Sequence, residues 1–461
     1  MKSSPAEIYF AGDDLCLSGV EESFLADIPY EKDQQRILTY PSYLETILRV
    51  LNQHKIPVES KISIEHPLTI SFDPKYELRP FQQEAFDEWK KEGRGTLILP
   101  TGSGKTFLGL AAIHDLNQAT LVLAPTIDLV EQWISNLQLL GISKKAIGQY
   151  GGGRQESDRP ITVSTYESAR IYLHHFRNRI GLVIFDEVHH LSGERWLAIA
   201  QGMVAPYRMG LTATLGDDHP TYNEIEQFVG PVLFQMTPTE LRELGYVAPF
   251  LIKRLPVPLN DKEKQTYLQY RSKYLEYLRK TGLNRARNPY QELVYRAYEP
   301  EARVALAAHR QARDIQFNAK EKIQHVREIL AQHVEEKTLV FSESVSFAER
   351  VSRELLIPVI TGQTATEERR AIMAGFRKGD LRILATSRVL DEGVDVPDAS
   401  IGIVVSGSAQ VRQFIQRLGR ILRPAPGKES AVLYEVVTTG TGEEGISRRR
   451  KNGIEKGRNS Y

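Results

Sequence analysis

The sequence predicts an α/β protein with two tandem parallel-sheet domains, a small N-terminal α+β domain and a helical insertion. Three observations lead to this prediction. Short apolar runs, each followed by a helical pattern, recur in two separate sets, as expected for strands buried on both faces of a parallel sheet. The segment between the two sets is dense in tyrosine and charged residues. The length of 461 residues fits about three domains.

The composition is that of a soluble globular protein, with 41% hydrophobic and 25% charged residues. No stretch of about 18 apolar residues is free of charges, so we expect no transmembrane helix and no membrane partner. The N-terminus lacks the long apolar run of a secretory signal, and the one cysteine, Cys16, cannot form an internal disulfide. These features favour a cytoplasmic location. The formal net charge of +1 argues at first against a nucleic-acid partner.

Residues 1–74 are predicted to form the small α+β domain. The run EIYFAGDDLCLSG reads as two short strands around an Asp-Asp turn. An amphipathic helix is expected over 43–51, with Ser42 as its cap. The run ISIEHPLTISF alternates like strands interrupted at Pro67.

The first large domain is expected over 75–250, with strands GTLILP, ATLVLAP, ITVST, GLVIFDE and YRMGLTAT. The second is expected over 251–440, with strands KTLVFSES, IPVITG, LRILATS, IGIVVSG and ESAVLYEV. Within it, 261–319 is predicted to be a charged helical hairpin placed ahead of that domain's first strand. Residues 441–461 read as a basic C-terminal tail.

A glycine-rich run lies between the strand GTLILP and the helical pattern FLGLAAIHDL. Its residues are Thr101, Gly102, Ser103, Gly104, Lys105 and Thr106. Glycines let backbone amides approach phosphates, and a helix N-terminus adds partial positive charge. Lys105 would reach the β- and γ-phosphates, and the Thr106 hydroxyl would ligate Mg²⁺. Leu99 stands where the full phosphate-loop pattern has glycine, and the alternative is an ordinary glycine-rich turn.

An acidic pair, Asp186 and Glu187, ends the strand GLVIFDE. In phosphate-loop enzymes such a pair holds Mg²⁺ and orients the attacking water. We therefore expect Asp186 to hold Mg²⁺ and Glu187 to activate water, the alternative being a solvated acidic turn. His189 and His190 follow, but no zinc-site spacing accompanies them.

These residues resemble known motifs. PTGSGKT, DEVHH and LTAT (211–214) are similar to motifs I, II and III of superfamily 2 helicases of the DExH type. TSRVLDEGVDVPDA (386–399) resembles motif V, and QRLGRILRP (416–424) resembles motif VI. A closer similarity, spanning roughly 75–455, is to the XPB helicases of nucleotide excision repair and transcription, particularly their compact archaeal forms.

The resemblance implies two RecA-like domains with ATP and Mg²⁺ in the cleft between them. It implies that 1–74 is a damage-recognition-like domain and that 261–319 is a thumb-like DNA-gripping insertion. The implied catalytic residues are Lys105, Asp186, Glu187, Gln416, Arg420 and Arg423, the two arginines reaching the γ-phosphate from the second domain. The implied ATP contacts are Arg79 and Gln82 in the adenine-reading segment LRPFQQ, the residues of the run 101–106, Gly393 and Asp395.

A translocase must hold the sugar–phosphate backbone without reading bases, which calls for hydroxyls, amides and cations. Residues at strand ends suit this, with helix caps or turns as the alternative: Pro125, Thr126, Thr165, Tyr166, Ser342 and Thr386. The insertion alternates rings and cations, namely Tyr267, Tyr270, Arg271, Lys273, Tyr274, Tyr277, Arg279 and Lys280. They would either stack on single-stranded bases or pack their tyrosines inward as an amphipathic helix. The basic run 448–451 could add non-specific phosphate affinity.

The resemblance implies an ATP-dependent DNA translocase or helicase moving 3′ to 5′, with DNA as partner. A structure-specific nuclease is a further implied partner, and the protein is expected to be a monomer or heterodimer. One departure concerns the family's Arg-Glu-Asp element, where this chain has Leu215-Gly216-Asp217-Asp218-His219. The alternatives are an RNA-dependent DExH ATPase, and an ATP-switched DNA-binding partner of a nuclease without robust unwinding. Near-neutral charge then predicts modest, salt-sensitive DNA binding rather than none.

Overall fold

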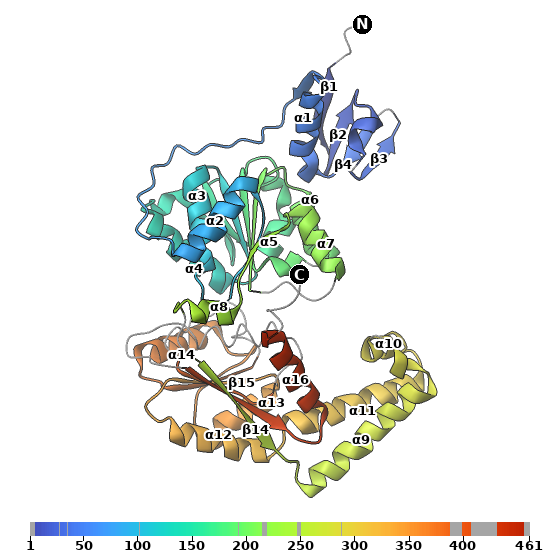
Figure 1. Cartoon of the computed structure of the whole chain (residues 1–461), viewed down its shortest axis with the longest axis vertical. Coiled ribbons are helices and arrows are strands. Elements are labelled where there is room, and N and C mark those ends of the chain that lie inside the picture. Colours follow the sequence, from blue (N-terminus) through green and yellow to red (C-terminus); the bar gives the residue numbers. More distant parts are fainter. Residues whose placement is uncertain are drawn as a thin grey trace. The chain divides into compact units, whose positions relative to one another are not determined.

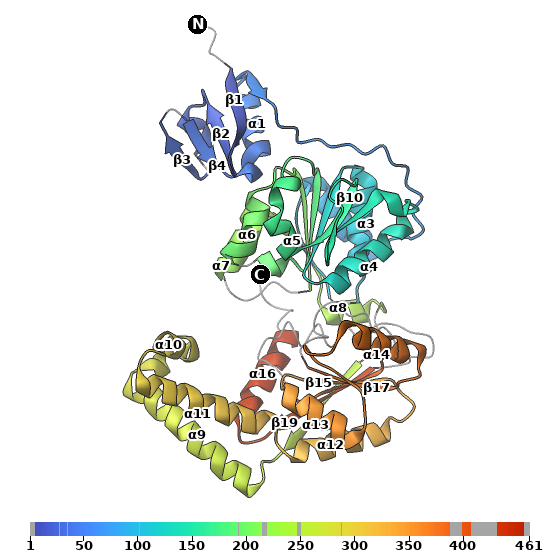
Figure 2. The same ribbon diagram turned by 180° about the vertical axis from the view of Figure 1, so that it is seen from behind.

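The computed structural model describes residues 5–455 apart from 27, 35, 101, 192, 214–218, 247–249, 287, 388–398 and 407–430. The chain forms two compact units that divide between Met236 and Thr237. Figure 1 and Figure 2 show their elements from opposite sides. Across the described ranges, no helix is both long and apolar enough to cross a membrane.

The N-terminal domain has the predicted α+β character, with one amphipathic helix on a sheet of five strands, of which only the first two were predicted. β1 and β2 form the expected antiparallel hairpin, in which Ala11 pairs with Asp14 across the turn. Leu44, Ile47 and Leu51 of α1 are buried in the core of this domain. The strand order is β3-β4-β2-β1-β5. The bounds are β1 (Ala6–Ala11), β2 (Asp14–Ser18), β3 (Tyr30–Asp33), β4 (Arg36–Thr39), α1 (Leu44–Gln53) and β5 (Val58–Ser60).

The prediction that Ser42 caps this helix is wrong. Tyr43 occupies the N-cap of α1 and makes no side-chain cap bond. Pro41, Ser42 and Tyr43 form a 3₁₀ turn, in which Ser42 is buried. Because proline favours the first position of a helical turn, the turn begins at Pro41 and places Ser42 inside it.

The prediction of strands over 62–72 is also wrong. The segment after β5 runs extended along the first sheet domain, where Figure 1 shows it as a long ribbon without arrows. Its backbone bonds go singly to loops of that domain: the Leu68 amide donates to Asn117 and the Asp73 amide to Leu140, both at 2.8 Å. The alternation of polar and apolar residues over 62–72 therefore reflects an extended segment with one face packed against protein, and not a strand of a sheet.

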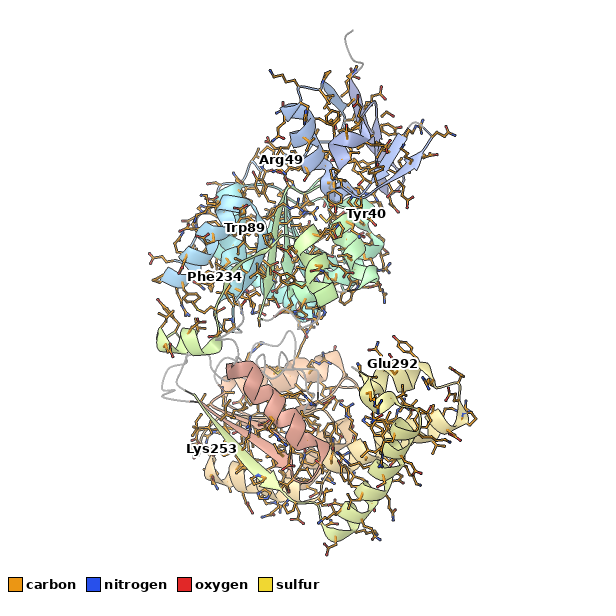
Figure 3. All side chains as sticks on the ribbon, turned by 45° about the vertical axis from the view of Figure 1, so that its right-hand side comes forward. Tyr40, Arg49, Trp89, Phe234, Lys253 and Glu292 are labelled. Atoms are coloured by element: carbon orange, nitrogen blue, oxygen red, sulfur yellow. The ribbon has the colours of Figure 1, made fainter. Side chains whose placement is uncertain are left out.

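The N-terminal domain contacts the first sheet domain directly. The Arg177 guanidinium donates to the Gly12 carbonyl at 2.6 Å and forms an ion pair with Asp13. The Tyr40 ring lies edge-on to Phe228 at 5.7 Å. Figure 3 shows Tyr40 on the side of the N-terminal domain that faces the first sheet domain.

The first sheet domain contains eight strands in the order β13-β6-β12-β11-β7-β10-β8-β9. All five predicted runs are strands of this sheet, and β7 and β11 are buried along their whole length, as expected for central parallel strands. Only β8 and β9 pair antiparallel among its described neighbours. The bounds are β6 (Arg94–Ile98), β7 (Thr120–Ala124), β8 (Ile147–Gly151), β9 (Arg154–Gln155), β10 (Ile161–Thr165), β11 (Leu182–Asp186), β12 (Tyr207–Thr212) and β13 (Val232–Gln235).

Helices cover both faces of this sheet. Figure 1 shows α2, α3 and α4 on one face and α5, α6 and α7 on the other. Because parallel strands end at one edge, the loops after β6, β7, β10, β11 and β12 lie along the same carboxyl edge. The bounds are α2 (Pro80–Glu92), α3 (Lys105–Leu116), α4 (Ile127–Leu137), α5 (Tyr166–Ile171), α6 (Glu194–Gln201) and α7 (His219–Phe228).

The second unit contains a parallel six-stranded sheet in the order β14-β19-β18-β15-β17-β16. The five predicted apolar runs are again strands. Helix α13 packs against β15, β16 and β17, and buried residues of α12 belong to the core of this sheet, while α14 connects β16 to β17 and α8 precedes the sheet in sequence. The bounds are α8 (Pro238–Glu243), β14 (Phe250–Val257), α12 (Glu321–Gln332), β15 (Thr338–Ser342), α13 (Val345–Leu355), β16 (Val359–Ile360), α14 (Thr366–Lys378), β17 (Ile383–Ser387), β18 (Ile401–Val404) and β19 (Ala431–Thr438).

The insertion is the predicted helical hairpin, with its own core around Tyr277, Leu293 and Leu306. Figure 2 shows α9 and α11 side by side, with α10 at their far end. Its predicted place ahead of the first strand of the second domain is wrong, because β14 precedes it and pairs with β19. The bounds are α9 (Asp261–Lys280), α10 (Pro289–Tyr295) and α11 (Pro300–Phe317).

The predicted C-terminal tail begins as a helix, α16 (Gly442–Glu455), fixed to the second unit. Glu443 is buried and accepts a hydrogen bond from the Lys322 ammonium at 2.7 Å. Ser447 donates to the Glu435 carboxylate of β19 at 2.8 Å. The start of the basic segment is therefore part of the fold and not a free tail.

Candidate functional site

The glycine-rich loop joins β6 to the N-terminus of α3, as the sequence predicts. Gly102 and Gly104 adopt φ values of 89° and 84°, which residues with a Cβ rarely adopt. A Cβ on Gly104 would lie 2.6 Å from Gln82 Nε2. The Lys105 ammonium donates to the Leu99 carbonyl at 3.3 Å, and Thr106 follows in the first turn of α3. Thr101 lies outside the described residues.

Leu99, the departure from the full phosphate-loop pattern, belongs to the strand side of this loop. Its side chain is fully buried, and its amide donates to the Thr212 carbonyl at 2.9 Å. The sheet ladder thus extends one residue beyond β6, and the turn is made by Gly102 and Gly104. Leucine is accommodated because the position has a buried strand environment.

Gln82, a predicted adenine contact, lies beside this loop and bonds to it. Its side chain is buried, and Nε2 donates to the carbonyls of Ser103 at 2.7 Å and Gly104 at 3.3 Å. Its Oε1 accepts from the Arg79 amide at 2.9 Å at the start of α2. Both amide hydrogens are therefore used on the loop, so Gln82 positions the loop.

The acidic pair lies at the end of β11 in the predicted place. Asp186 is 7% exposed, and its Oδ2 accepts a hydrogen bond from the Trp133 indole Nε1 at 2.8 Å. Its Oδ1 accepts from the Glu187 amide at 3.1 Å. Its main-chain carbonyl accepts from the Tyr166 hydroxyl at 2.9 Å. Glu187 has φ of 52°, so the turn between the two carboxylates adopts a left-handed conformation.

Burial first, and then the neighbouring Glu187 charge, raise the pKa of Asp186 to about 6. The Trp133 hydrogen bond and the Lys105 charge oppose this shift. A carboxylate buried in this way gains from a nearby cation, because the cation stabilises its charged form. The electrostatics thus suit a cation at the carboxyl edge of the sheet.

His189 and Thr212 extend the site, and sequence analysis assigned neither to catalysis. His189 is buried, and its Nδ1 lies 3.0 Å from Thr212 Oγ1 and 3.5 Å from Glu187 Oε2. Thr212 Oγ1 lies 3.4 Å from the same Glu187 oxygen. The end of β12 thereby fixes the Glu187 carboxylate. The signal for these residues was present in the DEVHH and LTAT motifs.

The donor set of this edge suits a nucleoside triphosphate with Mg²⁺. Ser103 Oγ is buried in the loop and has no partner among the described residues, as expected of a group that receives a ligand. The ammonium of Lys105 and the hydroxyl of Thr106 lie on the same loop-and-helix junction. Oxygen ligands from a hydroxyl and a carboxylate are those that Mg²⁺ prefers.

The residues predicted for motifs V and VI lie outside the described part of the chain. These are Gly393, Asp395, Gln416, Arg420 and Arg423. Leu215, Gly216, Asp217 and Asp218, which stand in the place of the family's Arg-Glu-Asp element, lie outside it as well.

Three of the six predicted nucleic-acid contacts are partly exposed and the other three are buried. Pro125, Thr126 and Thr165 are partly exposed at the ends of β7 and β10. Thr126 caps α4 by accepting from the Leu129 amide at 3.4 Å, and Thr165 caps α5. Both the cap and the contact are compatible with one hydroxyl, because a hydroxyl has two acceptor lone pairs.

The other three predicted contacts are buried in this structure. Tyr166 is 1% exposed and its hydroxyl is used by Asp186. Ser342 is 1% exposed and bonds Ser344 and Ser406. Thr386 is 1% exposed within β17. Residues at strand ends alternate between the interior and the edge, and sequence alone did not say which faced outward.

The tyrosines of α9 are buried or half-buried, which favours the amphipathic alternative for this helix, whereas Tyr295 and Tyr298 elsewhere in the insertion are exposed. Tyr267 and Tyr277 of α9 are buried, and the Tyr277 hydroxyl donates to Glu299 at 2.8 Å. The cations of the same helix, Arg271 and Lys273 among them, are exposed. A phosphate-facing surface therefore fits α9 better than a platform for stacked bases.

Two family models match the chain. One, described as "Type III restriction enzyme, res subunit", matches 75–217, and the other, "Helicase conserved C-terminal domain", matches 321–425. The first covers the phosphate loop and the acidic pair, and the second covers the second unit from α12 to β18.

Several curated proteins are similar along most of the chain. The DNA 3'-5' translocase XPB2 of Sulfurisphaera tokodaii is 40% identical over 402 residues, covering 87% of this chain and 90% of the relative. The DNA 3'-5' helicase XPB of Mycobacterium tuberculosis is 29% identical, covering 88% of this chain and 69% of the relative. Among solved structures, the helicase domain of Pyrococcus furiosus Hef aligns with a TM-score of 0.54 and 19% identity over 80% of this chain and 98% of that one. That likeness supports the two RecA-like domains.

Proposed function

Since the chain belongs to the XPB family of DNA helicases and translocases, we propose that it is an ATP-driven motor that moves 3′ to 5′ along DNA. The observation that carries this proposal is the arrangement at the carboxyl edge of the first sheet. A phosphate loop, a buried carboxylate and a second carboxylate held by a threonine and a histidine lie on adjacent strand ends.

Each of these groups has a proposed task in ATP hydrolysis. Lys105 binds the β- and γ-phosphates, and Gln82 holds the loop in shape for them. Thr106 and Asp186 would hold Mg²⁺, which neutralises phosphate charge when bound. Glu187 orients and deprotonates the attacking water, with Thr212 and His189 fixing its carboxylate.

The second domain contributes residues whose roles are proposed from their motifs. We assign Gln416, Arg420 and Arg423 to the γ-phosphate, where arginines stabilise charge on the transferring group. Gly393 and Asp395 are assigned to the nucleotide, as is Arg79.

DNA is the proposed track. Pro125, Thr126 and Thr165 lie at the exposed ends of two neighbouring parallel strands, which supports a contact with successive backbone phosphates. The exposed cations of α9 would add non-specific phosphate affinity.

The proposal is tested with Glu187→Gln in the full chain. We expect ATP hydrolysis to fall by at least about 100-fold while ATP binding changes little, because an amide cannot accept the proton from water. Glu226→Gln, on α7 away from the loop, is the matched control and should retain wild-type turnover. Rapid hydrolysis by Glu187→Gln would refute the assignment of the catalytic carboxylate.

The track and its direction are tested separately. Stimulation of ATP hydrolysis by single-stranded DNA and RNA of equal length distinguishes a DNA motor from an RNA-dependent ATPase. Unwinding of 3′- and 5′-tailed duplexes then reports direction. DNA-stimulated hydrolysis without unwinding, recovered on addition of a structure-specific nuclease, would favour the partner-dependent alternative.

A further inference from the structure

Two helices of the first sheet domain each donate one hydrogen bond to Asp186. Trp133 of α4 bonds its side-chain oxygen, and Tyr166 of α5 bonds its main-chain carbonyl. The two donors come from opposite faces of the sheet, since α4 and α5 flank it on either side (Figure 1). The turn that carries Asp186 and Glu187 is therefore held from both faces.

Both helices begin at proposed DNA contacts. Thr126 is the N-cap of α4, and Thr165 is the N-cap of α5. Trp133 follows Thr126 by seven residues, which corresponds to about 10 Å along one helix. Tyr166 follows Thr165 directly. A displacement of either cap would thus be transmitted through a rigid helix or a single peptide to Asp186.

The Trp133 indole is fixed tightly enough to transmit such a displacement. It is 1% exposed and lies against Gly109 of α3, the helix that begins at Lys105. A Cβ on Gly109 would approach the indole Cη2 to 2.6 Å and Ile184 Cδ1 to 3.3 Å. The ring therefore packs closely between the phosphate-loop helix and the strand of Asp186.

We infer that Trp133 and Tyr166 are positioning residues that transmit DNA occupancy at Thr126 and Thr165 to Asp186. This inference rests on the proposed function, because it requires a DNA-stimulated ATPase. DNA on the two threonines fixes α4 and α5, the two hydrogen bonds then fix the Asp186–Glu187 turn, and hydrolysis accelerates. Because both side chains are 1% exposed, we assign neither to a direct contact with DNA or ATP.

The test compares kcat with and without saturating single-stranded oligo-dT in Trp133→Phe and Tyr166→Phe variants of the full chain. Tyr166→Phe removes only the hydroxyl oxygen, so folding is preserved even if Trp133→Phe is destabilised. We expect the stimulation factor to fall about tenfold in Trp133→Phe and about fivefold in Tyr166→Phe, since a bond to a charged group is worth more than one to a carbonyl. The affinity for DNA, measured by fluorescence anisotropy, should stay within about twofold, because both variants keep the proposed DNA contacts Thr126 and Thr165.

Two control variants remove comparable groups elsewhere in the same domain. The Trp89 indole donates to the Arg208 carbonyl at 2.9 Å, so Trp89→Phe deletes a similar bond away from Asp186. Tyr150 is buried in the same core cluster as Tyr166, so Tyr150→Phe is the matched tyrosine control. Both controls should keep the wild-type stimulation factor.

The outcomes separate this inference from the proposed function. If wild-type hydrolysis is not stimulated by DNA, the proposed function fails, and the inference with it. If wild type is stimulated but the variants keep its factor, only the inference is overturned. It is equally overturned if kcat falls by the same factor with and without DNA, or if stimulation returns at higher DNA concentration.

Discussion

The buried ion pair between Lys322 and Glu443 fixes the start of α16 to the second sheet and allows a quantitative prediction. The Lys322 ammonium is 0% exposed and donates to Glu443 Oε2 and to the Val405 carbonyl, both at 2.7 Å. The same Glu443 oxygen accepts from the Thr438 amide at 2.9 Å. Lys322→Met removes one charge of a pair that has almost no access to water.

We expect Lys322→Met to destabilise the second unit by about 3–5 kcal/mol, because it leaves a carboxylate buried without its counter-charge. Glu443→Gln should cost a similar amount, since it leaves the ammonium in the same position. The double variant Lys322→Met/Glu443→Leu should recover most of the loss, because replacing a whole buried pair with apolar groups is often neutral.

Hydrogen exchange of the full chain measures this effect locally, since peptides from β19 and α12 report the second unit and peptides from β6 serve as an internal reference. Lys280 and Glu301 provide a matched control pair, also at 2.8 Å but 65% exposed on both sides. Lys280→Met should cost under about 1 kcal/mol. A loss in Lys322→Met no larger than that in Lys280→Met, or strictly additive losses in the double variant, would refute the reasoning.

Three further outcomes are expected. Gly109→Ala should lower both the thermal stability and kcat, because its Cβ would displace the Trp133 indole. This loss is expected although alanine is the better helix former by about 1 kcal/mol. Thermal unfolding and steady-state ATP hydrolysis measure the two effects. His309 has a pKa lowered by burial and by two neighbouring arginines, so the stability of the insertion should be full above about pH 6.5 and decline as pH falls below it. His309→Gln should remove that decline in exchange experiments between pH 5 and 8, and an unchanged decline would contradict the assignment. Arg177→Gln should loosen the N-terminal domain by about 1–3 kcal/mol through loss of its bond to Gly12, and limited proteolysis should then cleave the segment after β5 faster than in wild type.

Elements that consist of long apolar runs could be predicted from the sequence, because burial on both faces leaves an unbroken hydrophobic pattern. All ten such runs are strands of the two sheets. The segment around Pro67 could not be predicted. An extended segment with one face packed on protein shows the same alternation of polar and apolar residues as an edge strand. β14 was missed because the polar Lys253 and Arg254 interrupt its pattern, and the Arg254 partner, Glu435, is distant in sequence.

The candidate site was predictable where its residues adjoin one another in the chain. Lys105 and Thr106 follow their strand directly, and Asp186 ends its own. Trp133 could not be predicted, because its role depends on a hydrogen bond to a residue that is 53 positions away and on a gap left by Gly109. Nothing in the pattern of an amphipathic helix separates such a tryptophan from one that only fills the core.

The formal net charge of +1 does not measure the charge that a nucleic acid would meet. Arg208 is fully buried, and its guanidinium donates four hydrogen bonds of 2.6 to 3.0 Å to main-chain carbonyls of the first domain. Burial lowers its pKa, and its guanidinium cannot contact a phosphate as the exposed cations of α9 can. The Lys322 ammonium is likewise buried inside the second unit, where it pairs with Glu443. The Asp186 carboxylate, in contrast, is available to a metal ion. A near-zero sum therefore arises from charges in different environments, and an edge that binds phosphates is compatible with it.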